Sequence, residues 1–255
     1  MNTDLLYPLV VGAFVGLASG YLGSLMVLRK MSLVGDALSH VALPGLALGL
    51  LFHFNPFLGA FAALFTSIVF IWLIENKTKL STETLVGIFF TLSLAVGLII
   101  TPEPELLEAL FGDISKTSAP DAVIAIMLSL VAIFIVRRVY NKLVLGTISD
   151  DLAKSVGIKT KKIDFVFLLV VALIVALGIK VVGTLLMGAL VIIPAAASKN
   201  ISRNLGSYAG LSALFGLLSS LAGIYLSSAI KFAPGPLVVL TSAAIFFISL
   251  AFKRS

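Results

Sequence analysis

Two ionisable residues, Asp36 and His40, stand out because they lie within an apolar stretch of the chain, MSLVGDALSHVALPG. A separation of four residues places both side chains on one face of a helix, about one turn apart. A carboxylate oxygen and an imidazole nitrogen at this spacing can bind one divalent cation together, as the two histidines of an HExxH motif do. The pair is therefore a candidate metal site.

Two ligands alone are too few for a tight site. A second copy of the same helix across a two-fold axis would give two nitrogen and two oxygen ligands, which suits zinc or manganese and lacks the sulfur that soft copper prefers. Ser39 lies beside the pair as a possible supporting or weak ligand. Pro44 and Gly45, one turn later, are expected to bend or open the helix near the site.

Two other interpretations of the pair remain open. Asp36 and His40 can form a hydrogen bond that only holds two spans together, or they can relay protons. Asp36 follows Lys30 by only six residues, about 9 Å of helical rise, which puts it in the cytoplasmic half of a membrane unless the chain bends there. The other histidine, His53, is expected to be a solvated residue at the outer end of the span.

The composition identifies the kind of protein that carries this pair. Of 255 residues, 60% are hydrophobic and 12% are charged, whereas soluble domains are about 45–50% apolar and about 25% charged. Such a chain is not a soluble enzyme, a nucleic-acid-binding domain or a disordered protein. The absence of cysteine removes disulfides, thiolate metal sites and cysteine nucleophiles. The sequence predicts an integral membrane protein.

The apolar segments predict an all-α, polytopic bundle of eight or nine transmembrane helices in a single domain, 1–255. A helix needs about 20 mostly apolar residues to cross the hydrocarbon core. The candidates are 5–28, 33–52, 57–75, 84–101, 119–136, 164–179, 183–198, 206–230 and 236–252. Glycines at four-residue spacing predict close helix contacts; they are Gly12, Gly16 and Gly20, then Gly45 and Gly49, then Gly206 and Gly210.

The basic residues predict the orientation. With the N-terminus outside and alternating spans, only Lys116, Lys180 and Lys231 of the 18 Lys and Arg residues lie outside, and the other 15 are cytoplasmic. This positive-inside bias requires 164–179 and 183–198 to cross separately and places the C-terminus in the cytoplasm. The outer segment is acidic, which would concentrate cations at an entrance or simply keep a polar loop hydrated; its acids include Glu103, Glu105, Glu108 and Asp113.

The largest cytoplasmic segment, 137–163, contains a candidate docking element at 149–157. Ser149, Asp150 and Asp151 precede a short helical run, Leu152 to Val156, and Gly157 stops it. These are N-cap and C-cap signals. A short capped helix here is suited to docking a soluble partner; alternatively, its lysines would hold it on lipid headgroups. The chain has no Walker A loop, GxSxG, HExxH or kinase motif, so ATP hydrolysis would reside in another chain.

Four segments, in order, resemble the membrane permeases of the zinc/manganese/iron class of ABC importers, over essentially the whole length. They are RKMSLVGDALSHVALPG from Arg29, ISDDLAKSVGI from Ile148, GTLLMGALVIIPAAAS from Gly183 and APGPLVVL from Ala233. The first and third are specific, the second is moderately so, and the fourth is weak alone.

The resemblance implies a transport subunit with the fold of the cobalamin and siderophore permeases, in the plasma membrane of a prokaryote. Its partners would be a second copy, cytoplasmic ABC ATPases and an extracytoplasmic metal-binding protein, with no nucleic acid. Asp36 and His40 fall on the family's metal-coordinating positions, and the coupling-helix positions are Asp150, Asp151, Leu152, Ala153 and Gly157. Zinc, manganese or iron would be transported cargo rather than a permanently bound cofactor, with ATP on the partner.

Two rivals belong to other classes. A proton-coupled secondary cation transporter could use Asp36 and His40 as a relay and would need no ATPase. A scaffold subunit would use the pair only to hold helices together, and would tolerate Asn and Gln at the two positions.

Overall fold

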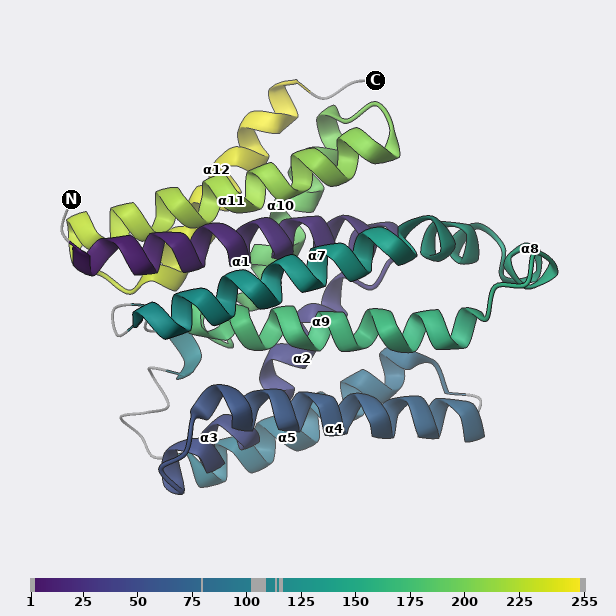
Figure 1. The fold of residues 1–255 in the computed structure, drawn as a ribbon, viewed down its shortest axis with the longest axis horizontal. Coiled ribbons are helices and arrows are strands. Elements are labelled where there is room, and N and C mark those ends of the chain that lie inside the picture. The colour runs from purple at the N-terminus through teal and green to yellow at the C-terminus, as the bar shows by residue number, and fades with distance from the viewer. Residues whose placement is uncertain (1–2, 79, 102–108, 113, 115–116, 253–255) are drawn as a thin grey trace.

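The computed structural model describes residues 3–78, 80–101, 109–112, 114 and 117–252, and in these ranges the secondary structure is helical, with no strand. The helices α1, α4, α7, α9 and α11 run roughly along the long axis of the molecule, α2 and α10 cross it, and α8 lies at one end (Figure 1). They are α1 (Thr3–Leu28), α2 (Ser32–Val41), α3 (Leu43–Leu51), α4 (Pro56–Lys77), α5 (Thr82–Ile100), α7 (Ala119–Ile148), α8 (Asp150–Ser155), α9 (Thr160–Val182), α10 (Met187–Ile201), α11 (Leu205–Ile230) and α12 (Pro234–Ala251).

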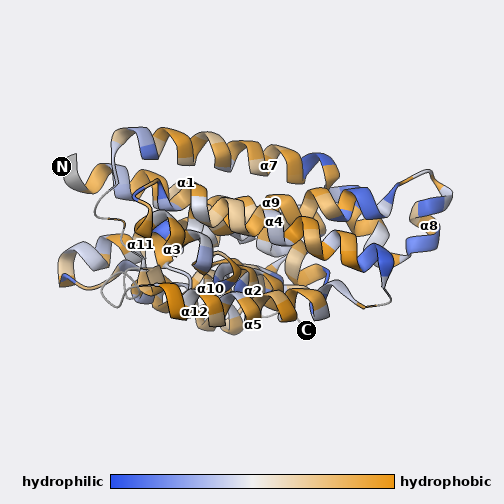
Figure 2. Cartoon of the chain, turned by 90° about the horizontal axis from the view of Figure 1, so that it is seen from below, coloured by the Kyte–Doolittle hydropathy of each residue, from blue (hydrophilic) through white to orange (hydrophobic). Residues whose placement is uncertain are grey.

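Eight helical segments of the described chain are long and apolar enough to cross a membrane, with α2 and α3 together forming one of them. Figure 2 shows hydrophobic residues along the middle of the bundle and hydrophilic segments toward the end that carries α8. The predicted polytopic all-α bundle is confirmed.

The segment that carries Asp36 is broken in the middle. α2 ends at Val41 and α3 begins at Leu43, with Pro44 in its first turn. Proline has no amide hydrogen and clashes with the preceding turn, so a helix that meets it bends or restarts. The bend expected from Pro44 and Gly45 is present, and Gly45 lets α3 lie directly against the backbone of Gly59 in α4.

The seventh of the nine apolar segments, 183–198, forms α10, a shorter helix of 15 residues. Leu186, just before α10, lies beside Gly235 at the start of α12, and Asn200 near the end of α10 donates a 2.8 Å hydrogen bond to Ser249 near the end of α12. α10 therefore runs alongside α12 from one end to the other. α9 and α10 are separate helices, and α10 is shorter than the eight candidate spans.

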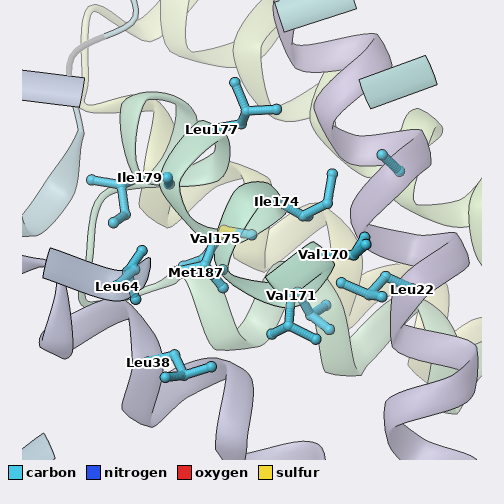
Figure 3. Packing of buried hydrophobic residues seen from close by; sticks show 14 of the residues in the cluster. Leu22, Leu38, Leu64, Val170, Val171, Ile174, Val175, Leu177, Ile179 and Met187 are labelled. Carbon is cyan, nitrogen blue, oxygen red and sulfur yellow. The ribbon is translucent and has the colours of Figure 1, made fainter. Parts of the chain in front are cut away.

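α9 forms the centre of the core. Its side chains from Phe167 to Val182 are largely buried, and the helix packs against α1, α2, α4, α7, α10 and α12. Figure 3 shows its residues Val170, Val171, Ile174 and Val175 in one cluster with Leu22 of α1, Leu38 of α2, Leu64 of α4 and Met187 of α10. The helix that carries Asp36 is thus attached to the most buried part of the bundle.

Glycine brings α1 and α11 into backbone contact. A Cβ on Gly20 would collide with the carbonyl of Ser212, whose hydroxyl donates a 2.5 Å hydrogen bond to the Gly20 carbonyl. The close contacts expected at Gly12, Gly16, Gly45 and Gly49 are also present. The expectation for Gly210 is wrong, because a Cβ there meets no atom of the described residues within 4 Å.

The segment 137–163, which the charge pattern predicts to be cytoplasmic, contains more helix than its sequence suggested. α7 does not stop at residue 136 but continues to Ile148. At its start, Ser118 and Asp121 form a reciprocal capping box, which satisfies amide groups that the first turn leaves without partners. The extended α7 carries α8 beyond the ends of the neighbouring helices (Figure 1).

The α1–α11 contact gives a first prediction. Gly20→Ala should lower the thermal unfolding midpoint in detergent, because an added methyl group in a full interface costs about 1–3 kcal/mol. Gly210→Ala is the control and should leave the midpoint unchanged or slightly raised. Equal midpoints for the two variants would contradict the close packing of α1 on α11.

Candidate metal site on α2

Asp36 and His40 both lie on α2, one turn apart as their spacing predicts. The chain reaches α2 through a tight turn, where Lys30 adopts a left-handed conformation with φ 60°. Figure 1 shows α2 in the middle of the bundle, between α9 and the pair α4 and α5. His40 is 8% exposed and Asp36 is partly exposed. The pair therefore combines a buried imidazole with a carboxylate that is accessible to solvent.

Asp36 packs against a glycine of another helix. A Cβ on Gly188, in the first turn of α10, would lie 2.5 Å from the Asp36 Cβ and 2.6 Å from its Oδ1. Real Cβ atoms do not come so close to their neighbours, so only glycine fits at this position without displacing the carboxylate. Gly188 therefore sets how near α10 can come to Asp36.

His40 retains a free nitrogen. The ring meets Phe90 of α5 edge to face, with 5.3 Å between ring centroids. Its Nδ1 is buried and has no hydrogen-bond partner among the described residues. A buried polar atom usually has a partner, and an imidazole nitrogen with its lone pair free is a metal ligand. Nδ1 of His40 is therefore a candidate ligand nitrogen.

Ser39 fastens α2 to the segment that precedes α10. Its fully buried Oγ lies 2.6 Å from the carbonyl oxygens of both Asp36 and Thr184. Thr184 in turn donates its amide to Ala109 at 2.9 Å. Ser39 thus points its hydroxyl at backbone carbonyls, where it supports the position of the helix that carries the two candidate ligands.

No group of three or more His, Cys, Asp or Glu side chains that could hold a metal occurs among the residues the structure describes. α2, α5, α10 and α12 lie on one side of the molecule, opposite α7 (Figure 2). Large apolar side chains are exposed on α2, α5 and α12, among them Leu33, Leu92, Leu240 and Phe247.

The predicted docking element forms α8. The Ser149 hydroxyl accepts the amide of Leu152, and Gly157, at φ 80°, ends the helix in a Schellman motif in which Ile158 donates its amide to Ala153 at 3.0 Å. Ala153 is buried, whereas the Leu152 side chain is half exposed. The helix is therefore locally fixed and presents an apolar side chain outward.

Two charged side chains of α8 stabilise it at one turn's spacing. Lys154 Nζ lies 2.5 Å from Asp150 Oδ2. The hydrogen bond from Lys154 lowers the pKa of Asp150, and the same bond raises the pKa of Lys154. Both groups are exposed and stay charged at neutral pH.

The acidic residues predicted at the outer mouth, Glu103, Glu105, Glu108 and Asp113, lie outside the described residues. Among the described residues, Lys180 at the end of α9 pairs with Asp121 at the start of α7, 2.9 Å apart. Both line a largely apolar cavity of about 300 Å³ between α1, α3, α4, α7 and α9.

Gly188, Thr184 and Phe90 are site residues that the sequence did not single out. Gly188 lies inside the quoted segment GTLLMGALVIIPAAAS, which marked the region but not the residue. Contacts between residues about 150 positions apart, such as Ser39 and Thr184, leave no signal in local spacing.

Comparison with known proteins identifies relatives over the full length. A model of the ABC 3 transport family matches residues 2–253. The chain is 36% identical to the high-affinity zinc uptake system membrane protein ZnuB of Haemophilus influenzae, over 98% of each protein. It is 29% identical to the manganese transport system membrane protein MntC of Listeria monocytogenes, over 96% of this chain and 89% of that protein.

Solved structures share the fold. PsaBC from Streptococcus pneumoniae, in complex with Fab, superposes with a TM-score of 0.85 at 29% identity, over 97% of this chain and 91% of that one. An inward-facing metal-chelate type ABC transporter superposes with a TM-score of 0.71 at 21% identity, over 97% and 84%. At 21% identity, the similarity to the second structure shows a common fold.

The contact between Asp36 and Gly188 gives a second prediction. Gly188→Ala should lower the thermal unfolding midpoint, because the methyl group must push Asp36 and α10 apart at a cost of about 1–3 kcal/mol. Gly87→Ala on α5, where a Cβ would meet no described atom within 4 Å, should leave the midpoint unchanged. A Gly188→Ala protein as stable as the wild type would show that α10 does not pack on Asp36 as described.

Proposed function

The chain belongs to the ABC 3 transport family, and on that premise we propose that it forms, with a second copy of itself, the membrane pathway of an ATP-driven importer of zinc or manganese ions. The resemblance to zinc/manganese/iron ABC permeases is confirmed by the family match and the full-length relatives. The chain is a multi-pass transport component, not an enzyme.

The observation that carries the proposal is the Asp36–His40 pair. It combines a carboxylate that can be reached with an imidazole whose Nδ1 has no partner among the described residues. The two full-length relatives are named for zinc uptake and for manganese transport. Both ions accept mixed imidazole and carboxylate ligands, which fits the proposed cargo.

Two copies are proposed because the described residues of one chain offer an incomplete ligand set. Facing α2 helices would supply two Asp36 and two His40 side chains, and the exposed apolar surface of α5 and α12 would be covered by the partner copy. Such a site must hold the ion weakly, because transport requires release as well as binding. Partly exposed carboxylates on a broken helix suit transient coordination.

ATP-driven motion would enter at α8. This helix lies at one end of the molecule, between the end of α7 and the start of α9 (Figure 1), and it exposes Leu152 and Val156. We place the ATPase subunits at this end, in the cytoplasm, with the C-terminus inside and the N-terminus outside. A binding protein would deliver the metal at the opposite end. Alternating access would then follow as ATP shifts the two copies between conformations.

Proteoliposome uptake tests the proposal as a whole. The chain is reconstituted with and without its ATPase and binding protein, and zinc and manganese are offered separately. We expect uptake only with both partners and ATP. Uptake by the chain alone, driven by a proton gradient, would overturn the proposal and identify a secondary transporter.

The ligand assignment gives a third prediction. Asp36→Ala and His40→Ala should each lower uptake by about tenfold or more, because loss of metal-site residues typically weakens function by one to two orders of magnitude. His53→Ala is the matched control, since His53 is exposed on the loop after α3, and it should transport normally. Each variant is first shown to co-purify with the ATPase. Near-normal uptake by either Asp36→Ala or His40→Ala would refute the assignment.

The docking role of α8 gives a fourth prediction. Gly157→Trp should weaken co-purification with the ATPase, because a residue with a Cβ is strained by about 1–2 kcal/mol at the left-handed φ of 80°. Gly157→Asn is the control, since asparagine tolerates this conformation at helix ends. Normal ATPase binding by the Trp variant would argue against α8 as the docking element.

A further inference from the structure

Arg29, the residue that follows α1, is a largely buried cation that pairs with a more exposed carboxylate. Its Nη2 lies 2.7 Å from Oδ1 of Asp164 near the start of α9, and the two side chains are 16% and 43% exposed. The guanidinium also lies over the Phe167 ring, 5.4 Å from the centroid. A hydrogen bond between charged groups in such a partly buried site is stronger than one between fully exposed groups.

Arg29 is closely connected to the start of α2. Only Lys30 and Met31 separate it from Ser32, the first residue of α2. The turn between them is tight, because Lys30 is left-handed and the Met31 amide donates a 2.8 Å hydrogen bond back to Met26. A displacement of Arg29 is therefore expected to move the start of α2 as well.

Asp164 is connected in the same way to α8. A small polar cavity of about 30 Å³ is lined by Arg29 and Asp164 and also by Asp150, the first residue of α8, and Thr160, the first residue of α9. Only residues 156–159 separate α8 from α9. Movement of α8 therefore changes both the position of the α9 start and the charges around the ion pair.

The geometry points to Arg29 as a positioning residue: through its bond to Asp164, it passes movement of the α8 segment to the helix that carries Asp36 and His40. This inference rests on the proposed function. The Arg29 Nη1 is buried without a hydrogen-bond partner among the described residues. This nitrogen is a donor that is free to bond a second acceptor when the ion pair rearranges.

A neighbouring contact provides a matched comparison. Lys161, three residues before Asp164 in α9, donates a 2.9 Å hydrogen bond to Asn76 at the end of α4. This contact also ties the start of α9 to a neighbouring helix, but it does not lead to α2. A general loosening of α9 would affect both contacts, whereas transmission to the metal site depends on Arg29 and Asp164.

The experiment measures metal ions transported per ATP hydrolysed, in proteoliposomes that contain the complete transporter. Arg29→Gln and Asp164→Asn should each lower this ratio, with ATPase co-purification intact. Residues along coupled networks change coupling about two- to thirtyfold, and we expect losses in that range. The double variant should lose no more than either single one, because the two side chains act through one bond. Lys161→Gln should retain the wild-type ratio.

The outcomes separate this inference from the proposed function. A wild-type transporter without ATP-dependent uptake would refute the proposed function itself. If the wild type transports and both single variants keep its ratio, only the role of Arg29 is refuted. Additive losses in the double variant, or an equal loss in Lys161→Gln, would also overturn it. Arg29→Lys keeps the charge but not the forked geometry; failure of both Arg29 variants to assemble would show a requirement for assembly instead.

Discussion

The interior of a bilayer offers no water to backbone amides and carbonyls, and the rest of the structure depends on this constraint. It forces the chain into helices and makes each interruption costly unless neighbouring backbone satisfies it. The segment between α9 and α10 meets that requirement by bonding Thr184 and Leu185 to Ala109 and Leu110. These interruptions also position the site, because Thr184 receives the hydroxyl of Ser39.

Small residues then decide how closely the helices meet. Gly20 lets α1 touch α11, Gly45 lets α3 touch α4, and Gly188 lets α10 touch Asp36. Without a strong hydrophobic force between helices in lipid, such contacts carry much of the packing. The same device that holds the bundle together therefore fixes the environment of the carboxylate proposed to bind the ion.

The two ends of the bundle have different chemistry. At one end, Asp121 and Lys180 border an apolar cavity. At the other, Arg29 and Asp164 border a small polar cavity beneath α8. The proposed metal pair lies on the helix that begins next to the second ion pair. Asp150 of α8, the helix proposed to dock the ATPase, therefore lines the same cavity as Arg29, which lies just before α2, the helix proposed to bind metal.

The helical membrane architecture could be predicted from the amino-acid sequence. So could the position of Asp36 and His40 on one face of a helix, the bend at Pro44 and the helix caps at Ser149 and Gly157. Each of these follows from local rules of hydropathy, periodicity and backbone conformation. Tertiary structure alone decided the extension of α7 to Ile148, the packing of Gly188 on Asp36, the bond from Ser39 to Thr184 and the pairing of Arg29 with Asp164. These features depend on contacts between segments far apart in the chain. Many glycines, serines and charged residues could make such contacts, and only the packing of the helices decides which of them do.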